Sequence, residues 1–377
     1  MIRKTAFVIT TINKPTSLEE YCKQVESYNH KNVEFFVVGD KKTPSIVPGY
    51  CEDLSSKYSV PINYMDLKEQ DEIIGEYDGL LDFYPYNDAN RKHIGIIKAY
   101  IDGFETMIVG DDDNFATDHD FFGYHDIVGS DQELKLIESP SGWFNVCEYL
   151  IEENNMPIYH RGYPWSQRKI EKENTTIRKE KGKIMVNAGL WMDDPDVDAV
   201  SRLFWPIRAI GMQEDFSPNF GLYPGTWCPF NNQNTALDRE VIPAYLTVYP
   251  TLRYSDILPS FVVCRIAEHL NHVISFGYPF SRQIRNKHNI WVDLEMEMYG
   301  AQAAEVFIDL LKSADLTKNS YHECLGELNT HFEKNRKIIE NLPTKQKKML
   351  TEFIEALNVY HYAFDTIRSN SKLSIER

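Results

Sequence analysis

Three consecutive carboxylates, Asp111, Asp112 and Asp113, follow an apolar run that ends in Gly110. Because like charges at this spacing repel one another, such a cluster is costly unless a cation neutralises it. Mg²⁺ and Mn²⁺ prefer oxygen ligands and also bind phosphate oxygens, so the cluster predicts a divalent metal site that can hold a diphosphate. The alternative is a solvated acidic turn, and the strand expected in front of the cluster favours the metal site.

Two further groups could act on the same ligand. Arg91 and Lys92 stand at the start of an expected helix, where cations oppose the helix dipole and need another partner, such as a phosphate or the Asp cluster. Asp40 follows a second apolar run and could accept hydrogen bonds from a base or a ribose. The alternatives are a solvated charged turn for the two cations and a plain acidic loop for Asp40. Together with the Asp cluster, these groups meet the needs of a GT-A glycosyltransferase, which stabilises a departing nucleoside diphosphate.

The elements that must position these groups follow from the apolar pattern. Strands are expected at residues 4–11, 33–38 and 106–109, and a helix with one apolar face at 87–103. Continuous apolar strands alternating with helices indicate a parallel sheet covered on both faces, and ligands of such sheets bind beyond the carboxyl ends of the strands. Ser17 and Glu20 have the spacing of a capping box, which predicts that a helix begins there.

The second half of the chain has a different pattern. Residues 140–260 are richer in Pro, Gly, Trp and Asn, and we expect loops and short strands there that form an acceptor side. After Pro259 the pattern becomes helical. We therefore expect an α/β domain over residues 1–300, with a mostly parallel Rossmann-like sheet of the GT-A type, followed by a helical appendage over residues 301–377.

Composition excludes several classes of protein. The 377 residues carry a net charge of −16 without a basic block, which makes nucleic acid an unsuitable partner. Six cysteines without a CxxC pair predict reduced thiols rather than disulfides or a zinc site. The apolar run near the N-terminus is too short for a signal peptide, and no stretch approaches the ~20 apolar residues of a membrane span. We expect a cytoplasmic protein, free or peripheral at a membrane, whose aromatic C-terminal helices are compatible with a homodimer.

The sequence also resembles a known family. It is similar to the plant reversibly glycosylated polypeptides (UDP-arabinopyranose mutases) and to the related STELLO-type glycosyltransferases. The matching segments keep the order of the family between residues 5 and 285, and they are TTINKP (10–15), VGDKKTP (38–44), NRKHIG (90–95), DDD (111–113), RGYPWS (161–166), NAGLW (187–191), PDVDA (195–199), NNQNT (231–235) and RYSDI (253–257).

The resemblance implies a GT-A fold, a nucleotide-sugar donor and a divalent metal. Asp111 and Asp113 match the metal-binding Asp-x-Asp motif of the family. Arg168 stands where the mutases carry the arginine that becomes glycosylated, but the sequence continues with Lys169 and Ile170 where theirs continues Glu-Gly. This departure counts against self-glycosylation and mutase activity.

The remaining site residues are hypotheses. Asp256 could deprotonate an acceptor hydroxyl if the reaction inverts the anomeric centre, or it could form a structural salt bridge with Arg253. Trp191 could stack on a sugar ring, or it could be a core aromatic. With Asp256 and Arg168 as the catalytic candidates, the residues expected to bind the donor are Thr11, Asp40, Arg91, Lys92, Asp111, Asp112, Arg161, Asn187, Trp191, Asn234 and Arg253.

These observations favour a glycosyltransferase that uses Mn²⁺ or Mg²⁺. It would move a sugar from a nucleotide diphosphate sugar, with UDP as the favoured nucleotide, to a hydroxyl of a glycan or lipid-linked acceptor. Surface-polysaccharide synthesis is one setting for such an enzyme. Two alternatives are a nucleotide-sugar mutase that interconverts pyranose and furanose forms, and a non-catalytic scaffold with the same fold.

Overall fold

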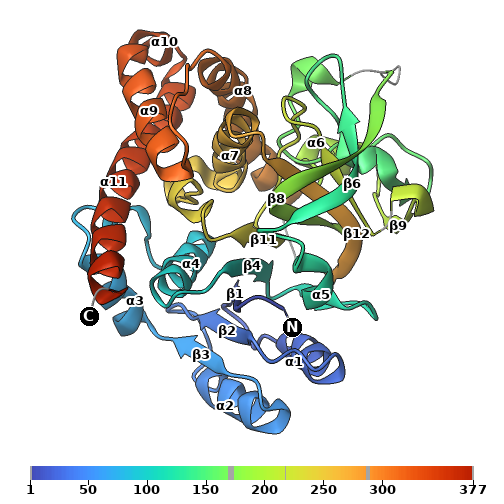
Figure 1. Cartoon of the computed structure of the whole chain (residues 1–377), viewed down its shortest axis with the longest axis vertical. Coiled ribbons are helices and arrows are strands. Elements are labelled where there is room, and N and C mark those ends of the chain that lie inside the picture. The colour runs from blue at the N-terminus through green and yellow to red at the C-terminus, as the bar shows by residue number, and fades with distance from the viewer. Residues whose placement is uncertain (1, 169–173, 217, 286–288, 376–377) are drawn as a thin grey trace.

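A computed structural model describes residues 2–168, 174–216, 218–285 and 289–375. Within these residues, twelve strands form one mixed sheet in the order β3-β2-β1-β4-β11-β8-β6-β10-β12-β5, with β9 joined to β8 and β7 joined to β9 (Figure 1). Helices cover the sheet, and α7 to α11 form a helical region beside it (Figure 1). The expected α/β class with additional C-terminal helices is confirmed.

The bounds of the elements are as follows. The strands are β1 (Thr5–Thr10), β2 (Val33–Val38), β3 (Ile62–Met65), β4 (Thr106–Asp111), β5 (Asn114–Ala116), β6 (Asp131–Glu138), β7 (Leu150–Glu152), β8 (Thr176–Asp193), β9 (Ala209–Met212), β10 (Asn219–Leu222), β11 (Asn234–Asp238) and β12 (Val273–Gln283). The α-helices are α1 (Leu18–Ser27), α2 (Val47–Tyr58), α3 (Leu67–Gly75), α4 (Lys92–Ile101), α5 (Phe121–His125), α6 (Ala199–Phe204), α7 (Ile257–His269), α8 (Ile290–Lys312), α9 (Tyr321–Lys334), α10 (Arg336–Glu340) and α11 (Thr344–Ile375).

The first half of the sheet is parallel, as expected. β1 pairs in parallel with β2 on one side and β4 on the other, so that Thr10 lies beside both Val38 and Asp111. β3 extends this half, also in parallel with β2. β3, α2 and α3 were not predicted from the sequence. β3 is a four-residue edge strand in which only Met65 is fully buried, so it lacks a continuous apolar run.

Alternation along β1 distributes its side chains between two cores. Ala6 and Val8 belong to the core that includes the residues of α4, whereas Phe7 and Ile9 belong to the core formed with α1 and α2. A strand that is buried on both faces has a continuous apolar sequence, and β1 could be predicted for this reason. Gly95 lets α4 lie directly on the sheet, since a Cβ atom there would come within 2.7 Å of Val8.

The second half of the sheet contains both parallel and antiparallel pairs, so the sheet as a whole is mixed. β8 is its longest strand, pairing antiparallel with β6 and β11 and in parallel with β12. The expectation of only loops and short strands over residues 140–260 was wrong here. The N-terminal part of β8 is exposed and rich in charge, and it is held by distant partners, including the Arg178–Glu138 and Lys179–Glu133 ion pairs with β6. A local pattern does not reveal such pairing.

The expected capping box at the start of α1 is also wrong. Ser17 does precede α1, but its side chain makes no capping hydrogen bond. The Ser17 hydroxyl instead donates to the backbone carbonyl of Asp112, 2.9 Å away. The helix start is thereby tied to the acidic turn rather than capped by its own side chains.

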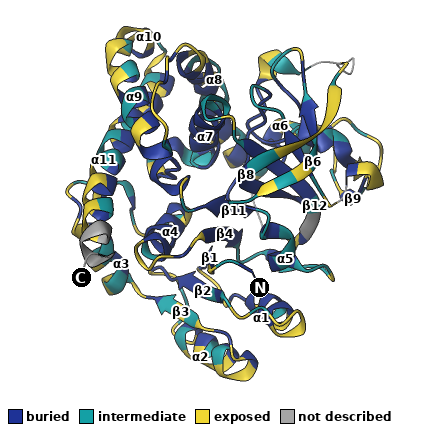
Figure 2. Ribbon diagram, viewed as in Figure 1, coloured by how far each residue is buried: buried dark blue, intermediate teal, exposed yellow. Residues whose placement is uncertain are grey.

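The C-terminal helices share a core with the sheet. Figure 2 shows α4 and the centre of the sheet buried, with exposed residues along the peripheral elements, among them α1, α2, α9, α10 and α11. Tyr360 of α11 lies 2.9 Å from His93 of α4, oxygen to Nε2, and Phe364 packs edge-on against Tyr100. The same hydrophobic core runs from Ala6 to Ile367. The domain boundary at residue 300 stays a prediction, but the helices beyond it are packed against the α/β part.

The six cysteines are free and buried, as their spacing predicts. In the described part of the chain, no helix combines the length and the apolar character needed to cross a bilayer.

Candidate functional site

The carboxyl ends of β1 and β4 are joined through the acidic turn. The hydroxyl of Thr11, the first residue after β1, donates to Oδ2 of Asp112 at 2.6 Å. The Ser17 hydroxyl binds the carbonyl of the same aspartate. Asp112 is therefore turned toward the loop that follows β1, and the two strand ends form one edge.

Asp40 belongs to the same edge. Its backbone N–H donates to the Thr43 hydroxyl at 2.7 Å, and that hydroxyl donates to the carbonyl of Thr11 at 2.6 Å. The backbone N–H of Asp88 donates to Oδ2 of Asp40 at 3.2 Å. The structure thus brings together Thr11, Asp40 and the acidic turn at the strand ends, where an α/β sheet binds its ligands.

Lys92, the first residue of α4, supplies positive charge to this edge from the interior of the protein. Its ammonium group is buried and donates to Oδ1 of Asp111 at 2.5 Å, to the Asn232 carbonyl at 2.9 Å and to the Gly110 carbonyl at 3.2 Å. The unfavourable position of this cation at the start of α4 is explained by its contact with the Asp cluster. A buried ammonium requires such a set of acceptors, because burial without partners is costly.

Arg91 points elsewhere. Its guanidinium is completely buried and donates to Oε1 of Gln70 at 2.8 Å, to the Tyr84 carbonyl at 2.8 Å and to Oδ1 of Asp71 at 2.9 Å. Gln70 in turn donates to the carbonyls of Gly39 and Met65, at the end of β2 and of β3. Arg91 therefore supports the edge by fixing α3 and is not placed beside the acidic turn.

The acidic turn has the donor set for a hard dication. Burial raises the pKa of Asp112, hydrogen bonds from Thr11 and Asn13 lower it, and the neighbouring charge of Asp111 raises it again. In the part of the chain that the structure describes, the three carboxylates do not converge as a complete three-ligand group. Mg²⁺ and similar ions are commonly held by one or two carboxylates, with phosphate oxygens and water as the other ligands. The Asp111 side chain, 25% exposed, is open to such a ligand, and its pairing with Asp113 as a metal site stays a prediction.

A buried ion cluster lies next to this edge. Arg161 donates to both oxygens of Asp256, at 3.0 and 2.8 Å, and its Nε donates to Asp196 at 3.0 Å. Burial alone would raise the pKa of Asp196, but the Arg161 charge and its hydrogen bonds hold that pKa far below its usual range. One guanidinium therefore pairs with two buried carboxylates.

Asn232 connects the two clusters. Its carbonyl accepts from Lys92, while its N–H lies 3.4 Å from Oδ2 of Asp256. The neighbouring Asn231 donates its side-chain amide to Asp196 at 2.6 Å. The short segment before β11 therefore bridges the acidic turn and the buried cluster, a role that sequence reasoning missed because it is carried largely by backbone atoms.

The suggested Asp256–Arg253 salt bridge is not the one that forms. Arg253 instead pairs with Glu297 of α8, Nε to Oε1, at 2.7 Å. The other oxygen of Glu297 accepts the N–H of Ala199 at the start of α6, at 2.7 Å. Asp256 is 5% exposed and fully engaged with Arg161, which makes it a poor base for an external hydroxyl.

Arg168 lies on the same loop as Arg161. Both arginines pair with aspartates of the segment that precedes α6, Arg161 with Asp196 and Arg168 with Asp198. Asp198, two residues beyond Asp196, forms an ion pair with the Arg168 guanidinium. That guanidinium also stacks over Trp165, 3.7 Å from the ring centroid, and over Tyr159 at 4.9 Å. Lys169 and Ile170, at which the motif departs from the mutase pattern, lie outside the described residues.

Like Arg91, three more of the expected donor-binding residues are in the interior. Asn187, Trp191 and Asn234 are at most 1% exposed. Two of them contact the same imidazole. The Asn187 amide nitrogen lies 3.1 Å from Nδ1 of His125, and Oδ1 of Asn234 lies 3.1 Å from Nε2 of His125. Burial lowers the pKa of His125 to about 4, so the imidazole is neutral at neutral pH. Burial favours the structural alternative for Trp191, and His125 was not found from the sequence.

Comparisons with known proteins agree with the resemblance. The family model described as reversibly glycosylated polypeptide matches residues 100–361, which extends the similarity beyond residue 285 into the C-terminal helices. "Probable UDP-arabinopyranose mutase 2" from Solanum tuberosum is 28% identical over 257 residues, which are 64% of this chain and 66% of that protein. "UDP-arabinopyranose mutase 1" from Arabidopsis thaliana is 28% identical over 255 residues, covering 64% and 68%. The chain thus spans about two thirds of the length of these relatives.

Solved structures with a similar chain course are glycosyltransferases. Glucosyl-3-phosphoglycerate synthase from Mycobacterium tuberculosis, in complex with Mn²⁺ and uridine-diphosphate-glucose, has a TM-score of 0.39 and 10% identity, covering 84% of this chain and 83% of that one. Mannosyltransferase PcManGT from Pyrobaculum calidifontis, in complex with GDP-Man and Mn²⁺, has a TM-score of 0.37 and 7% identity, covering 97% and 87%.

Proposed function

The chain belongs to the reversibly glycosylated polypeptide family, and on this premise we propose that it is a nucleotide-sugar mutase that interconverts the ring forms of a sugar carried on a nucleoside diphosphate. The observation that carries the proposal is that the stretch matched by the family, residues 100–361, contains both the acidic turn and Arg168. The relatives named as mutases support the reaction class.

In this proposal the edge formed by the ends of β1, β2 and β4 binds the nucleoside diphosphate. Asp111 and Asp113 would hold a divalent cation, Mn²⁺ or Mg²⁺, which neutralises the diphosphate as the sugar leaves it. Lys92 orients the Asp111 carboxylate, because its ammonium group donates to Oδ1. Asp40 accepts hydrogen bonds from the base or the ribose.

The sugar must be held while it is detached from the diphosphate. We assign this to Arg168. The bond between the anomeric carbon and the phosphate oxygen breaks, a bond from a guanidinium nitrogen to that carbon forms, and the guanidinium proton passes to Asp198, which already pairs with Arg168. While the sugar is held on Arg168, its anomeric carbon–ring oxygen bond opens as the guanidinium nitrogen forms a C=N bond to that carbon, and the ring oxygen takes up the proton from Asp198. A different hydroxyl of the sugar then adds to the same carbon and gives its proton back to Asp198, which closes the other ring. Reversal of the first step returns the sugar to the same diphosphate in the other ring form, so that no further reactant is consumed.

A glycosyltransferase is the second candidate, and one observation favours it. Lys169 and Ile170 replace the Glu-Gly that follows the reactive arginine in the mutase pattern. A transferase would pass the sugar to an acceptor hydroxyl and would not need Arg168 as a covalent carrier. The engagement of Asp256 with Arg161 leaves such an enzyme without an obvious base among the residues named from the sequence.

The deciding experiment omits the acceptor. Purified protein is incubated with UDP-arabinopyranose and Mn²⁺, and the ring forms of the nucleotide sugar are quantified by chromatography and NMR. A mutase yields UDP-arabinofuranose, and Arg168→Ala abolishes this product, whereas the exposed control Arg178→Ala does not. Slow hydrolysis alone, with the Arg168→Ala variant still transferring sugar once an acceptor is supplied, would establish the transferase instead. If UDP and Mn²⁺ together leave the Tm unchanged, both enzyme proposals are overturned in favour of a scaffold, since a ligand that binds the native state must stabilise it.

A further inference from the structure

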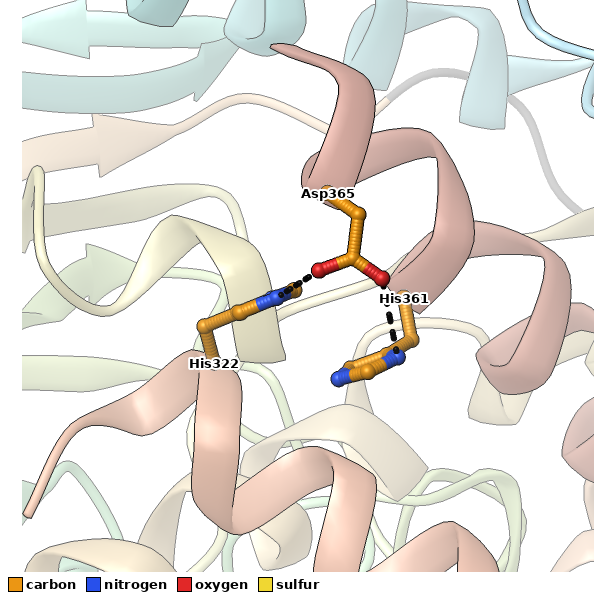
Figure 3. A group of neighbouring side chains, drawn as sticks. All are labelled: His322, His361 and Asp365. Carbon is orange, nitrogen blue, oxygen red and sulfur yellow. Dashed lines mark hydrogen bonds and ion pairs between the residues drawn. The ribbon is translucent and has the colours of Figure 1, made fainter. Parts of the chain in front are cut away.

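Two histidines and an aspartate meet between α9 and α11, in the C-terminal helical region (Figure 3). Nε2 of His322 lies 2.8 Å from Oδ1 of Asp365, and Nδ1 of His361 lies 3.9 Å from Oδ2 of the same carboxylate. The two imidazole rings are stacked, with centroids 4.3 Å apart and planes within 8°. One ligand atom from each residue lies within 4.8 Å of the other two, and no other group of three His, Cys, Asp or Glu side chains in the described part of the chain does so.

Both histidines present an imidazole nitrogen to the Asp365 carboxylate. A neutral imidazole nitrogen is a good ligand for first-row transition metals. The side chain of His322 is buried, and its Nδ1 has no hydrogen-bond partner among the described residues.

A glycine in α9 makes room for this arrangement. A Cβ atom at Gly326 would lie 2.8 Å from Nε2 and 3.2 Å from Cε1 of His361. Glycine in the interior of a helix costs about 1 kcal/mol relative to alanine. The absence of a side chain at this position lets the imidazole of α11 lie against the backbone of α9, one turn after His322.

The cluster is open to solvent on one side. It lines a surface pocket of about 490 Å³. Lys318, which precedes α9, Glu323 of α9 and Arg368 of α11 also line this pocket. A metal ion could therefore enter from solvent and complete its coordination with water. Two nitrogen ligands and one carboxylate oxygen, with an open position, suit Zn²⁺, Co²⁺ or Ni²⁺ rather than the hard cations that all-oxygen sites bind.

We propose that His322, His361 and Asp365 bind a zinc-type transition-metal ion, which fastens α11 to α9. This site is separate from the acidic turn in residues, in position in the chain and in ligand chemistry. It does not depend on the proposed mutase activity. Its role is to hold the C-terminal helix in place, because the ligands come from two helices and the ion binds only when the helices are docked.

The test uses the full chain, stripped of metal with a chelator and dialysed. Zn²⁺ is titrated by isothermal calorimetry into the Asp113→Asn protein, the reference in which the acidic turn is weakened, and into three variants made in it. These variants add His361→Gln, Asp365→Asn or, as the matched control, His331→Gln of α9. The reference and the control should bind one equivalent with the same affinity, and each ligand variant should bind at least ~10-fold more weakly. Equal binding in all four proteins, or no binding, would overturn the proposal.

Two further measurements separate a metal site from a hydrogen-bonded cluster. Co²⁺ should give intense visible absorption bands in the control protein that are lost in Asp365→Asn. Gly326→Ala should weaken Zn²⁺ binding although alanine favours the helix, because the new methyl group displaces His361. If a ligand variant fails to fold, judged by far-UV circular dichroism, Gly326→Ala decides the question alone, and unchanged affinity in that variant contradicts the proposed geometry.

Discussion

Lys92 and Asp111 form an ion pair at the end of β4, in which the ammonium nitrogen lies 2.5 Å from Oδ1. The lysine is 2% exposed and the aspartate side chain 25%, so the positive charge is inside the protein while the carboxylate reaches the surface. The pair therefore joins a buried cation to a carboxylate at the proposed ligand-binding edge. Its two members are separated by 18 residues, and each stands at the boundary of an element that the sequence predicts.

Replacing Lys92 with methionine should destabilise the protein. The carbonyls of Gly110 and Asn232 lose their donor and Asp111 loses its counter-charge, so we expect the free energy of unfolding to fall by about 2 kcal/mol. Lys98→Met on the same helix is the control, because its exposed pair with Asp102 should contribute less than about 1 kcal/mol. Urea denaturation measures both. Equal decreases in the free energy of unfolding of the two variants would show that the buried pair stabilises the protein no more than the Lys98–Asp102 pair does.

Asp113→Asn should abolish activity and metal-dependent binding of UDP while leaving the fold intact. The substitution keeps the size of the side chain but removes one anionic ligand of the proposed cation. We expect the Mn²⁺-dependent rise in Tm with UDP to disappear and the Tm of the ligand-free protein to change little. Asp118→Asn, an exposed position shortly after the same turn, serves as the control. A variant that retains full turnover would remove Asp113 from the metal site.

Arg161→Met should be far more damaging than loss of a surface arginine. It leaves Asp196 and Asp256 buried without their common counter-charge, and breaking such a buried cluster costs about 3–5 kcal/mol. Arg178→Met removes an exposed pair with Glu138 and should cost less than about 1 kcal/mol. Because the Arg161 contacts lower the pKa of Asp196, their stabilisation is present above the unfolded-state pKa of about 4 and is lost as the pH falls below it.

The measurement for Arg161 is the pH dependence of unfolding. Between pH 5 and pH 3 the wild type should lose stability more steeply than Arg161→Met, because only the wild type holds Asp196 with a lowered pKa. Parallel curves for the two proteins would contradict the assignment of that shift to Arg161.

Two buried histidines should make the protein sensitive to mild acid. Burial lowers the pKa of His93 to about 3 and that of His125 to about 4. In the unfolded chain both titrate near a pKa of about 6.5, so below that pH the unfolded state binds protons that the native state excludes. Stability should therefore fall with decreasing pH from about 6.5, by about 1.4 kcal/mol per pH unit for each histidine.

Single His93→Gln and His125→Gln variants test this contribution. Each lacks one of the two titrating groups, so its unfolding free energy should depend less on pH between 6 and 5 than that of the wild type. His269→Gln, which changes a partly exposed histidine at the end of α7, should keep the wild-type slope. A slope that is the same in all four proteins would assign the acid sensitivity to other groups.

The sequence predicts those parts of the molecule that depend on local pattern. β1, β2 and β4 are continuous apolar runs because both faces of each strand are buried, and the acidic turn follows the last of them directly. The direction in which a side chain points could not be predicted from the sequence. Arg91 and Lys92 are adjacent cations that the sequence treats alike, yet one is directed to α3 and the other to Asp111.

Features made by distant segments could not be predicted. The partners of β8 lie on β6, β11 and β12, and the bridge through Asn232 uses backbone atoms. For the C-terminal cluster, the His361 and Asp365 spacing of four residues on one helix is visible, but His322 is on another helix and joins them only through packing.

The contact between His93 and Tyr360 has a consequence for how the chain matures during translation. Helix α4 completes its hydrophobic surroundings with α11, whose Tyr360 stands 267 positions after His93 in the chain. While the ribosome is still adding that helix, the apolar surface of α4 is exposed and available to chaperones. Chains released early by truncation should for the same reason be recognised by the quality-control machinery, even though they contain every residue of the nucleotide edge.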